Sequence, residues 1–249
     1  MLINKVKEKV FKRASSLYYV KPHILKADKP VVSFTFDDVP RSAINNGANV
    51  LKKYNVSGTF YLSGALSGKE FLGLEQFYPE DIETLLDTGQ EIGCHTYDHC
   101  NCNEVATECF RRALDNNNFF FERYLADRDV TSFSYPYGST SIETKKLIRA
   151  RYSSGRGIQP GVNSGLVDLC ELKANALYTN SMSEMIIDNL VEIAKSNNGW
   201  LIFYTHGVSE NPNRFGCVPN LLEYAVKAVV DRDIEILNVK SALAHHSFN

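Results

Sequence analysis

Two short segments carry the side chains best suited to chemistry. Asp37 and Asp38 stand side by side at the end of an apolar run, and His95 and His99 lie four positions apart. The histidine spacing puts both rings on one face of a helix or tight turn, a geometry common in zinc sites. Two imidazoles, a carboxylate ligand and a spare carboxylate base are what a mononuclear metal hydrolase needs. His206, which ends a later apolar run, is a further candidate.

Both segments also have more ordinary interpretations. Adjacent aspartates most often belong to a turn or a helix N-cap. A mixed zinc site of Cys94, His95, His99 and Cys102 is another alternative, but a single residue separates Cys100 from Cys102, fewer than structural zinc sites use. The six cysteines are expected to be reduced thiols, because the chain shows no secretion signal.

The elements that must position these groups alternate between strand and helix. Runs rich in β-branched and aromatic residues predict strands at 31–36, 56–62, 91–94, 130–135, 200–204 and 234–237. Amphipathic stretches predict helices at 42–53, 79–87, 104–125, 142–150, 182–196 and 221–230. This alternation predicts parallel βαβ units, and the candidate residues follow predicted strands, where parallel barrels carry their chemistry. The glycine-rich stretch 155–165 is predicted to be a loop.

Composition excludes several classes of protein. The 249 residues are 44% hydrophobic and 22% charged, with a formal net charge of −2, which suits a globular chain with a sizeable core. No clustered basic face is evident, so we expect no nucleic-acid partner. No stretch approaches the roughly 18 apolar residues of a membrane span, and no signal peptide is evident. We therefore expect a cytoplasmic protein.

The first residues differ from the rest in charge. We divide the chain into a basic N-terminal extension, residues 1–29, and a catalytic barrel, residues 30–249. Leu2, Val6, Val10 and Phe11 are spaced as on one face of an amphipathic helix. Such a helix would pack on the domain or contact a membrane surface peripherally.

Four motifs in chain order resemble those of the polysaccharide deacetylases, the NodB-homology group or carbohydrate esterase family 4. They are TFDD at 35–38, QEIGCHTYDH at 90–99, FSYPYG at 133–138 and WLIFYTHG at 200–207. Residues 58–61 resemble the family's second strand. The resemblance covers roughly residues 30 to 210 and implies an α/β fold, a distorted (β/α)7 barrel of the NodB-homology type.

The resemblance also implies a role for each candidate residue. It implies a divalent metal, typically Zn²⁺, bound by Asp38, His95 and His99. Asp37 would be the general base, His206 the general acid, and the backbone N–H of Tyr137 would help hold the oxyanion. The implied activity is metal-dependent removal of an N-acetyl group from a sugar. We expect an intracellular intermediate of surface polysaccharide or glycan synthesis, which would be a free, nucleotide-linked or lipid-linked sugar.

Departures from the family pattern keep alternatives open. The third motif commonly carries an arginine where this chain has Ser134. Arg149, Arg151 or Arg156 could replace it, and we favour Arg151 or Arg156. Tyr204 stands in a run that is usually leucine-rich, so a more polar acetyl pocket is expected. The alternatives are an amidohydrolase that acts on a non-sugar amide and a catalytically silent barrel that binds a glycan.

Overall fold

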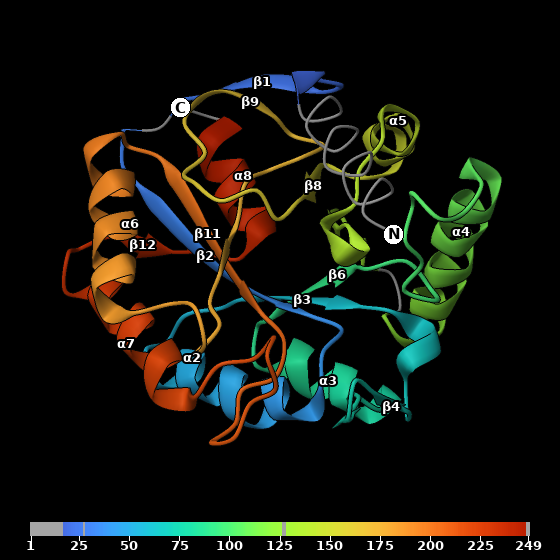
Figure 1. The fold of residues 1–249 in the computed structure, drawn as a ribbon, viewed down its shortest axis with the longest axis horizontal. Helices are drawn as coiled ribbons and strands as arrows, with labels where there is room; N and C mark the ends of the chain where they lie inside the picture. The colour runs from blue at the N-terminus through green and yellow to red at the C-terminus, as the bar shows by residue number, and fades with distance from the viewer. Residues whose placement is uncertain (1–16, 27, 126–127, 248–249) are drawn as a thin grey trace, which may run out of the picture.

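The computed structural model describes residues 17–26, 28–125 and 128–247. Its centre is an eight-stranded sheet in the order β10-β11-β2-β3-β6-β7-β8, with β12 paired to β2, and every pairing in it is parallel. The strands are β2 (Val31–Asp37), β3 (Thr59–Leu62), β6 (Glu91–Cys94), β7 (Ser132–Ser134), β8 (Ser154–Arg156), β10 (Asn175–Ala176), β11 (Trp200–Thr205) and β12 (Glu235–Ile236). The sheet curls within a ring of helices (Figure 1), which confirms the predicted barrel-like α/β fold.

The strand that leads to the paired aspartates lies at the centre of the sheet. All seven residues of β2 are buried, and β11 and β3 flank it. Phe34 and Phe36 belong to the larger apolar core, while Val31 packs in a smaller one with Trp200. The sequence of a parallel strand that is covered on both faces is typically a continuous apolar run, as it is here.

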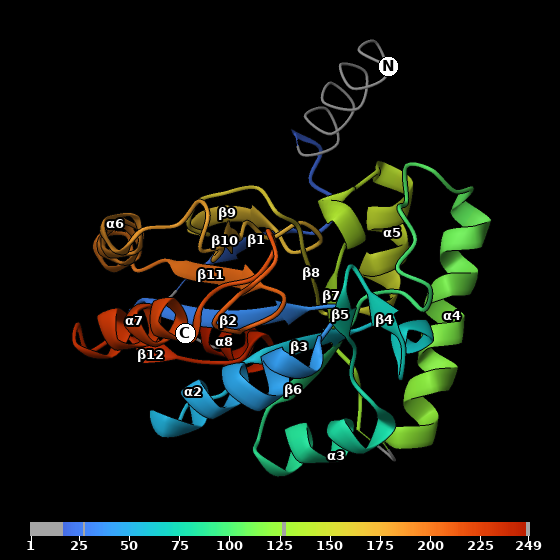
Figure 2. The same ribbon diagram turned by 60° about the horizontal axis from the view of Figure 1, so that its bottom comes forward.

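The helices cover the sheet on both sides (Figure 2). They are η1 (Ala43–Ala48), α2 (Asn49–Lys53), α3 (Pro79–Asp87), α4 (Thr107–Tyr124), α5 (Ile142–Arg151), α6 (Glu184–Ser196), α7 (Pro219–Val230) and α8 (Val239–Ser247), with short 3₁₀ turns η2 (Gly64–Leu66) and η3 (Pro136–Gly138). Two small antiparallel ribbons complete the fold: β1 (Pro22–Leu25) with β9 (Gly165–Asp168), and β4 (Glu70–Phe71) with β5 (Leu74–Glu75). Among the described residues, no helix combines the length and apolar character that a membrane crossing requires.

The structure corrects the predicted loop at 155–165. Gly155 and Arg156 belong to β8, which pairs with β7, and Gly165 begins β9. A three-residue strand is too short to show a period, so only its pairing identifies it. The helix α8 and the strand β1 were not predicted either.

The predicted division at residue 29 stays a prediction. The amphipathic helix expected near the start of the extension lies outside the described residues. Farther along the extension, Pro22–Leu25 pairs with β9, so this part packs against the rest of the chain.

Candidate metal centre and active site

A tight turn at the end of β2 brings both aspartates to one place. Asp37 is the last residue of the strand, and the N–H of Val39 donates to its carbonyl oxygen at 2.6 Å. Asp38 and Val39 both adopt positive φ, 60° and 61°. This conformation is unfavourable for a β-branched residue and typical of functional sites. Because the chain reverses here, two carboxylates that would diverge along a strand are both buried at the same edge of the sheet.

His95 and His99 lie against Asp38. The Nε2 atoms of His95 and His99 are 3.6 Å and 3.2 Å from Asp38 Oδ1. His95 follows β6 directly, and its Nδ1 lies 2.8 Å from the carbonyl oxygen of Ser134. Since a carbonyl can only accept, Nδ1 carries the proton and Nε2 presents its lone pair toward Asp38. His99 reaches the same point through a backbone with φ of 52°.

These three residues fit a divalent cation. One ligand atom from each of Asp38, His95 and His99 lies within 4.8 Å of the other two. Asp38 Oδ1 is buried and has no hydrogen-bond partner, and burial together with the neighbouring Asp37 raises the pKa of Asp38 well above its usual range. A buried carboxylate oxygen without a partner needs a compensating charge. Two imidazole nitrogens and one carboxylate oxygen form a donor set that suits Zn²⁺.

The alternative site with cysteines is not supported. Cys94 Sγ accepts a hydrogen bond from the side chain of Asn117 at 3.2 Å, and Cys102 Sγ donates to the carbonyl oxygen of Ser139 at 3.0 Å. In the described part of the chain, the group of residues able to hold an ion contains no cysteine.

Asp37 pairs with an arginine instead of with a histidine. Arg156, fully buried on β8, donates through Nη2 to both carboxylate oxygens of Asp37, at 2.6 Å to Oδ2, and to the hydroxyl of Ser134. Burial by itself would raise the pKa of Asp37, but the charge of Arg156 and its hydrogen bonds hold that pKa below its usual value. Asp37 is therefore kept ionised, as a general base must be.

Only one of the three candidate arginines reaches this carboxylate. Arg151 Nη1 binds Asp115 at 2.5 Å, and Arg149 donates to the carbonyl oxygen of Val20 at 3.2 Å. The guanidinium of Arg156 also lies 4.8 Å from the ring centroid of Tyr204. The tyrosine in the usually leucine-rich run thus supports the arginine that compensates for Ser134.

His206 approaches Asp38 from the side of β11. Its Nε2 is 3.7 Å from Asp38 Oδ2, and its Nδ1 is 3.1 Å from the carbonyl oxygen of Phe215. The backbone N–H of His206 donates to the same carbonyl, also at 3.1 Å. Burial lowers the pKa of His206. No pattern in the sequence indicated Phe215, because only the fold brings its carbonyl to this ring.

Tyr137 completes the set of predicted residues. It occupies η3 with φ of 58°, and its ring centroid lies 4.6 Å from that of His99. The side chain is 56% exposed, so it forms part of the rim and not of the core. On the same side of the site, Phe71 contacts His99 edge-on at 5.2 Å, a neighbour that the sequence did not suggest.

Comparison with solved structures identifies the fold. The carbohydrate esterase family 4 domain of a multidomain xylanase, from the hindgut metagenome of Trinervitermes trinervoides, superposes with a TM-score of 0.63. It is 16% identical, and the match covers 89% of this chain and 93% of that domain. A pseudoenzyme of the same family from Bacillus anthracis superposes with a TM-score of 0.61 at 16% identity, over 88% of this chain and 66% of its own. At such identities these likenesses show the fold alone.

Comparison with known sequences identifies the family. A peptidoglycan N-acetylmuramic acid deacetylase of Bacillus subtilis, PdaC, is 26% identical over 147 residues, which are 59% of this chain and 29% of that protein. The chain spans less than half the length of the curated relatives it matches. The sequence profile of the polysaccharide deacetylases matches residues 25–152, just over half of the 249 residues. The chain therefore belongs to the polysaccharide deacetylase family.

Proposed function

We propose that this chain is a metal-dependent N-deacetylase of an acetylated sugar. The observation that carries the proposal is that two buried carboxylates lie in one site, and only one of them is paired with a cationic side chain. Asp37 is neutralised by Arg156, while Asp38 faces His95 and His99 with one oxygen that lacks a partner. One carboxylate is thus prepared to accept a proton and the other to bind a cation.

The ligands of the cation would be Asp38, His95 and His99, and we propose Zn²⁺ as the ion. When bound, it would supply Lewis-acid polarisation of the amide carbonyl and of the attacking water. Asp37 would accept the proton of that water. Because Arg156 keeps Asp37 ionised, the carboxylate would be able to accept that proton.

The remaining groups would act on the carbonyl oxygen and the leaving amine. We assign the Tyr137 backbone N–H to the developing oxyanion, since its residue lies against His99 at the rim. His206 would donate a proton to the amine, which is otherwise a poor leaving group. The Phe215 carbonyl fixes the Nδ1 position of His206, so that Nε2 points toward Asp38 and the site. Acetate and a free amino sugar would be the products.

An N-acetylated sugar is the substrate class we propose. The relatives named above include a deacetylase of peptidoglycan N-acetylmuramic acid, and another is named for peptidoglycan N-acetylglucosamine. The form of the sugar, whether free, nucleotide-linked or lipid-linked, and its intracellular origin stay predictions from the sequence.

The test is acetate release by the zinc-reconstituted protein from free, nucleotide-linked, lipid-linked and polymeric N-acetylated sugars. We expect release from one class, lowered roughly 10²- to 10⁴-fold by Asp37→Asn, the range typical of a lost general base. Asp115→Asn on α4 is the matched control, because Asp115 pairs with Arg151 outside the site. Bound metal without acetate from any sugar would favour a non-sugar amide or a silent barrel.

A further inference from the structure

The ribbon formed by β1 and β9 has an uncovered apolar face. Ile24 and Leu166 are direct cross-strand partners, and they are 56% and 58% exposed. Cross-strand partners point to the same face of a ribbon. The neighbouring pair, His23 and Val167, turns the other way, because Val167 is buried. In the view of Figure 1, β1 forms the upper edge of the molecule and no described element lies outside it.

The residues just before β1 are also apolar and exposed, and Tyr19 lines the same hollow as Leu166. Leu17, Tyr18 and Tyr19 are 84%, 54% and 41% exposed. Together with Ile24 and Leu166 they account for five of the fourteen large exposed apolar side chains in the described part of the chain. We call these five residues the ribbon face. Isolated exposed apolar residues are common, but a cluster of this kind marks an interaction surface.

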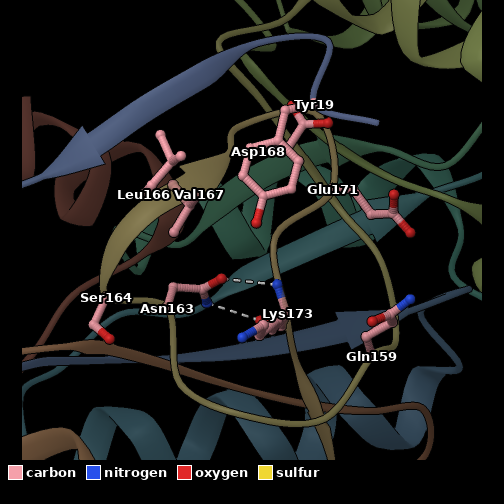
Figure 3. A pocket seen from close by; sticks show the side chains of 9 residues that line it. All are labelled: Tyr19, Gln159, Asn163, Ser164, Leu166, Val167, Asp168, Glu171 and Lys173. Carbon is pink, nitrogen blue, oxygen red and sulfur yellow. Dashed lines mark hydrogen bonds between the residues drawn. The ribbon is translucent and has the colours of Figure 1, made fainter. Parts of the chain in front are cut away.

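Figure 3 shows how the ribbon face meets polar groups. Tyr19 and Leu166 lie on one side of a hollow of about 60 Å³, and Lys173 lies on the other. The acidic residues Asp168 and Glu171 also line the hollow, but the buried Lys145 binds both of them, at 2.8 Å and 3.0 Å. One cation against two carboxylates leaves this cluster a formal charge of −1, which is smaller than the positive charge of residues 1–29.

The segment that contains β1 differs in net charge from the rest of the chain. Residues 1–29 contain eight lysines and arginines and two acidic residues, a net charge of +6. Since the whole chain carries −2, residues 30–249 carry −8. Four of the five residues of the ribbon face therefore belong to a strongly basic segment, which is joined to an acidic remainder of the chain that contains the fifth, Leu166.

We infer that the ribbon face is a docking surface for an anionic lipid bilayer. Aliphatic side chains such as Ile24 and Leu166 enter the boundary between headgroups and acyl chains, and tyrosines favour that interface. Lysines and arginines within a Debye length of anionic headgroups add attraction. The inference is independent of the proposed function, because none of these residues belongs to the site.

The charge argues against the other occupants of such a face. A second copy of the chain would bring two segments of +6 together, and they would repel each other. A nucleic acid would satisfy the charge but would leave the aliphatic pair without a role, because phosphate recognition uses polar and cationic groups.

The experiment is co-sedimentation of the full chain with vesicles of phosphatidylcholine, with and without phosphatidylglycerol. We expect binding that requires phosphatidylglycerol, weakens with salt, and falls on the order of tenfold or more in Ile24→Thr/Leu166→Thr, which preserves strand-forming residues. The matched control is Met185→Thr/Ile193→Thr, which removes two exposed apolar side chains from α6 and should bind like the wild type. Unchanged acetate release and thermal unfolding would establish that both variants are folded.

Three results would overturn the inference. One is equal binding of Ile24→Thr/Leu166→Thr and the wild type to anionic vesicles. The second is a wild-type dimer in analytical ultracentrifugation that this double variant dissociates, which would assign the face to a second copy. The third is retention on heparin without any binding to vesicles, which would assign the basic segment to nucleic acid.

Discussion

Two buried clusters in this protein each contain one cationic side chain and two carboxylates. They differ in how many of the carboxylate oxygens have a partner. Lys145 on α5 binds Asp168 and Glu171 and donates to the carbonyl oxygen of Tyr18 at 2.7 Å. Asp168 also accepts from the backbone N–H groups of Val20, Lys21 and Cys170. In the candidate site, Arg156 compensates Asp37 but leaves Asp38 Oδ1 with no hydrogen-bond partner.

The two clusters differ in what ionisation does to the fold. Burial would raise the pKa of Asp168, but Lys145 and three backbone N–H groups hold it below its usual value. Burial and Asp37 raise the pKa of Asp38 well above its usual range. Ionised Asp168 therefore stabilises the fold, whereas ionised Asp38 costs stability until a cation compensates it. The cluster around Lys145 is complete within the protein, whereas the candidate site leaves one carboxylate oxygen of Asp38 without a hydrogen-bond partner.

The largest expected effect comes from breaking the structural cluster. Lys145→Met should lower the free energy of unfolding by about 3–5 kcal/mol, because it leaves two buried carboxylates without their cation. Acetate release per folded molecule should stay unchanged, since Lys145 lies outside the site. Urea denaturation at pH 7 measures the loss, and Lys146→Met, an exposed lysine on the same helix, is the matched control.

The pH dependence of this loss is a second check. The folded pKa of Asp168 is lowered, so its contribution is fully present above the unfolded value of about 3.9 and is lost as the pH falls through the folded value. The difference in stability between the wild type and Lys145→Met should therefore narrow below about pH 4. A difference that stays constant across that range would contradict the electrostatic explanation.

In the candidate site, a substitution of Asp38 should change the free energy of unfolding less, and should raise it. In metal-free protein at pH 7, Asp38→Asn should raise the free energy of unfolding by about 1 kcal/mol or more, the equivalent of a one-unit pKa shift. A carboxylate whose pKa is raised on folding destabilises the fold at any pH above its unfolded pKa, and asparagine lacks this penalty and tolerates positive φ. Zn²⁺ at a hundred times its Kd should stabilise the wild type by about 2.7 kcal/mol.

Calorimetric scans with chelator and with Zn²⁺ test both halves of this prediction. Asp38→Asn should respond much less to Zn²⁺ than the wild type, and Asp168→Asn should respond fully while being less stable in either condition. If zinc stabilised Asp38→Asn as strongly as the wild type, Asp38 would not be a ligand.

The residues that approach one another at the site were foreseeable because they end long, strongly patterned strands. Asp37 ends β2 and Asp38 follows it, while His206 follows β11 and His95 follows β6. The apolar runs of β2 and β11 are continuous. Parallel strands bring their carboxyl ends to one edge, so sequence order was enough to place these groups together. The alternation of strands and helices likewise predicted the α/β class.

The positions of residues on short or irregular elements could not be predicted in the same way. Arg156 lies on the three-residue β8, within the stretch predicted to be a loop. The sequence favoured Arg151 and Arg156 over Arg149 but could not choose between the two. Only the pairing of β8 with β7 carries Arg156 to Ser134, its register partner. Phe215 and β1 were missed for a related reason: a carbonyl contact and an edge ribbon depend on distant parts of the chain.

An effect on the reaction rate, and not on stability, distinguishes the position of the arginine from its charge. Arg156→Lys keeps the cation but loses the planar donor set, so kcat should fall about 10- to 100-fold, equivalent to about 1.4–2.7 kcal/mol, with KM little changed. The exchange variant Ser134→Arg/Arg156→Ser moves the arginine to the strand where the family pattern has it. Because Ser134 and Arg156 already share hydrogen bonds beside Asp37, the exchange should recover more activity than Arg156→Ser alone. Steady-state kinetics of the three variants measures this order. Equal rates in Arg156→Ser and the wild type would show that the activity of Asp37 does not depend on its ion pair with Arg156. The ion pair between Arg156 and Asp37 would then have only a structural role.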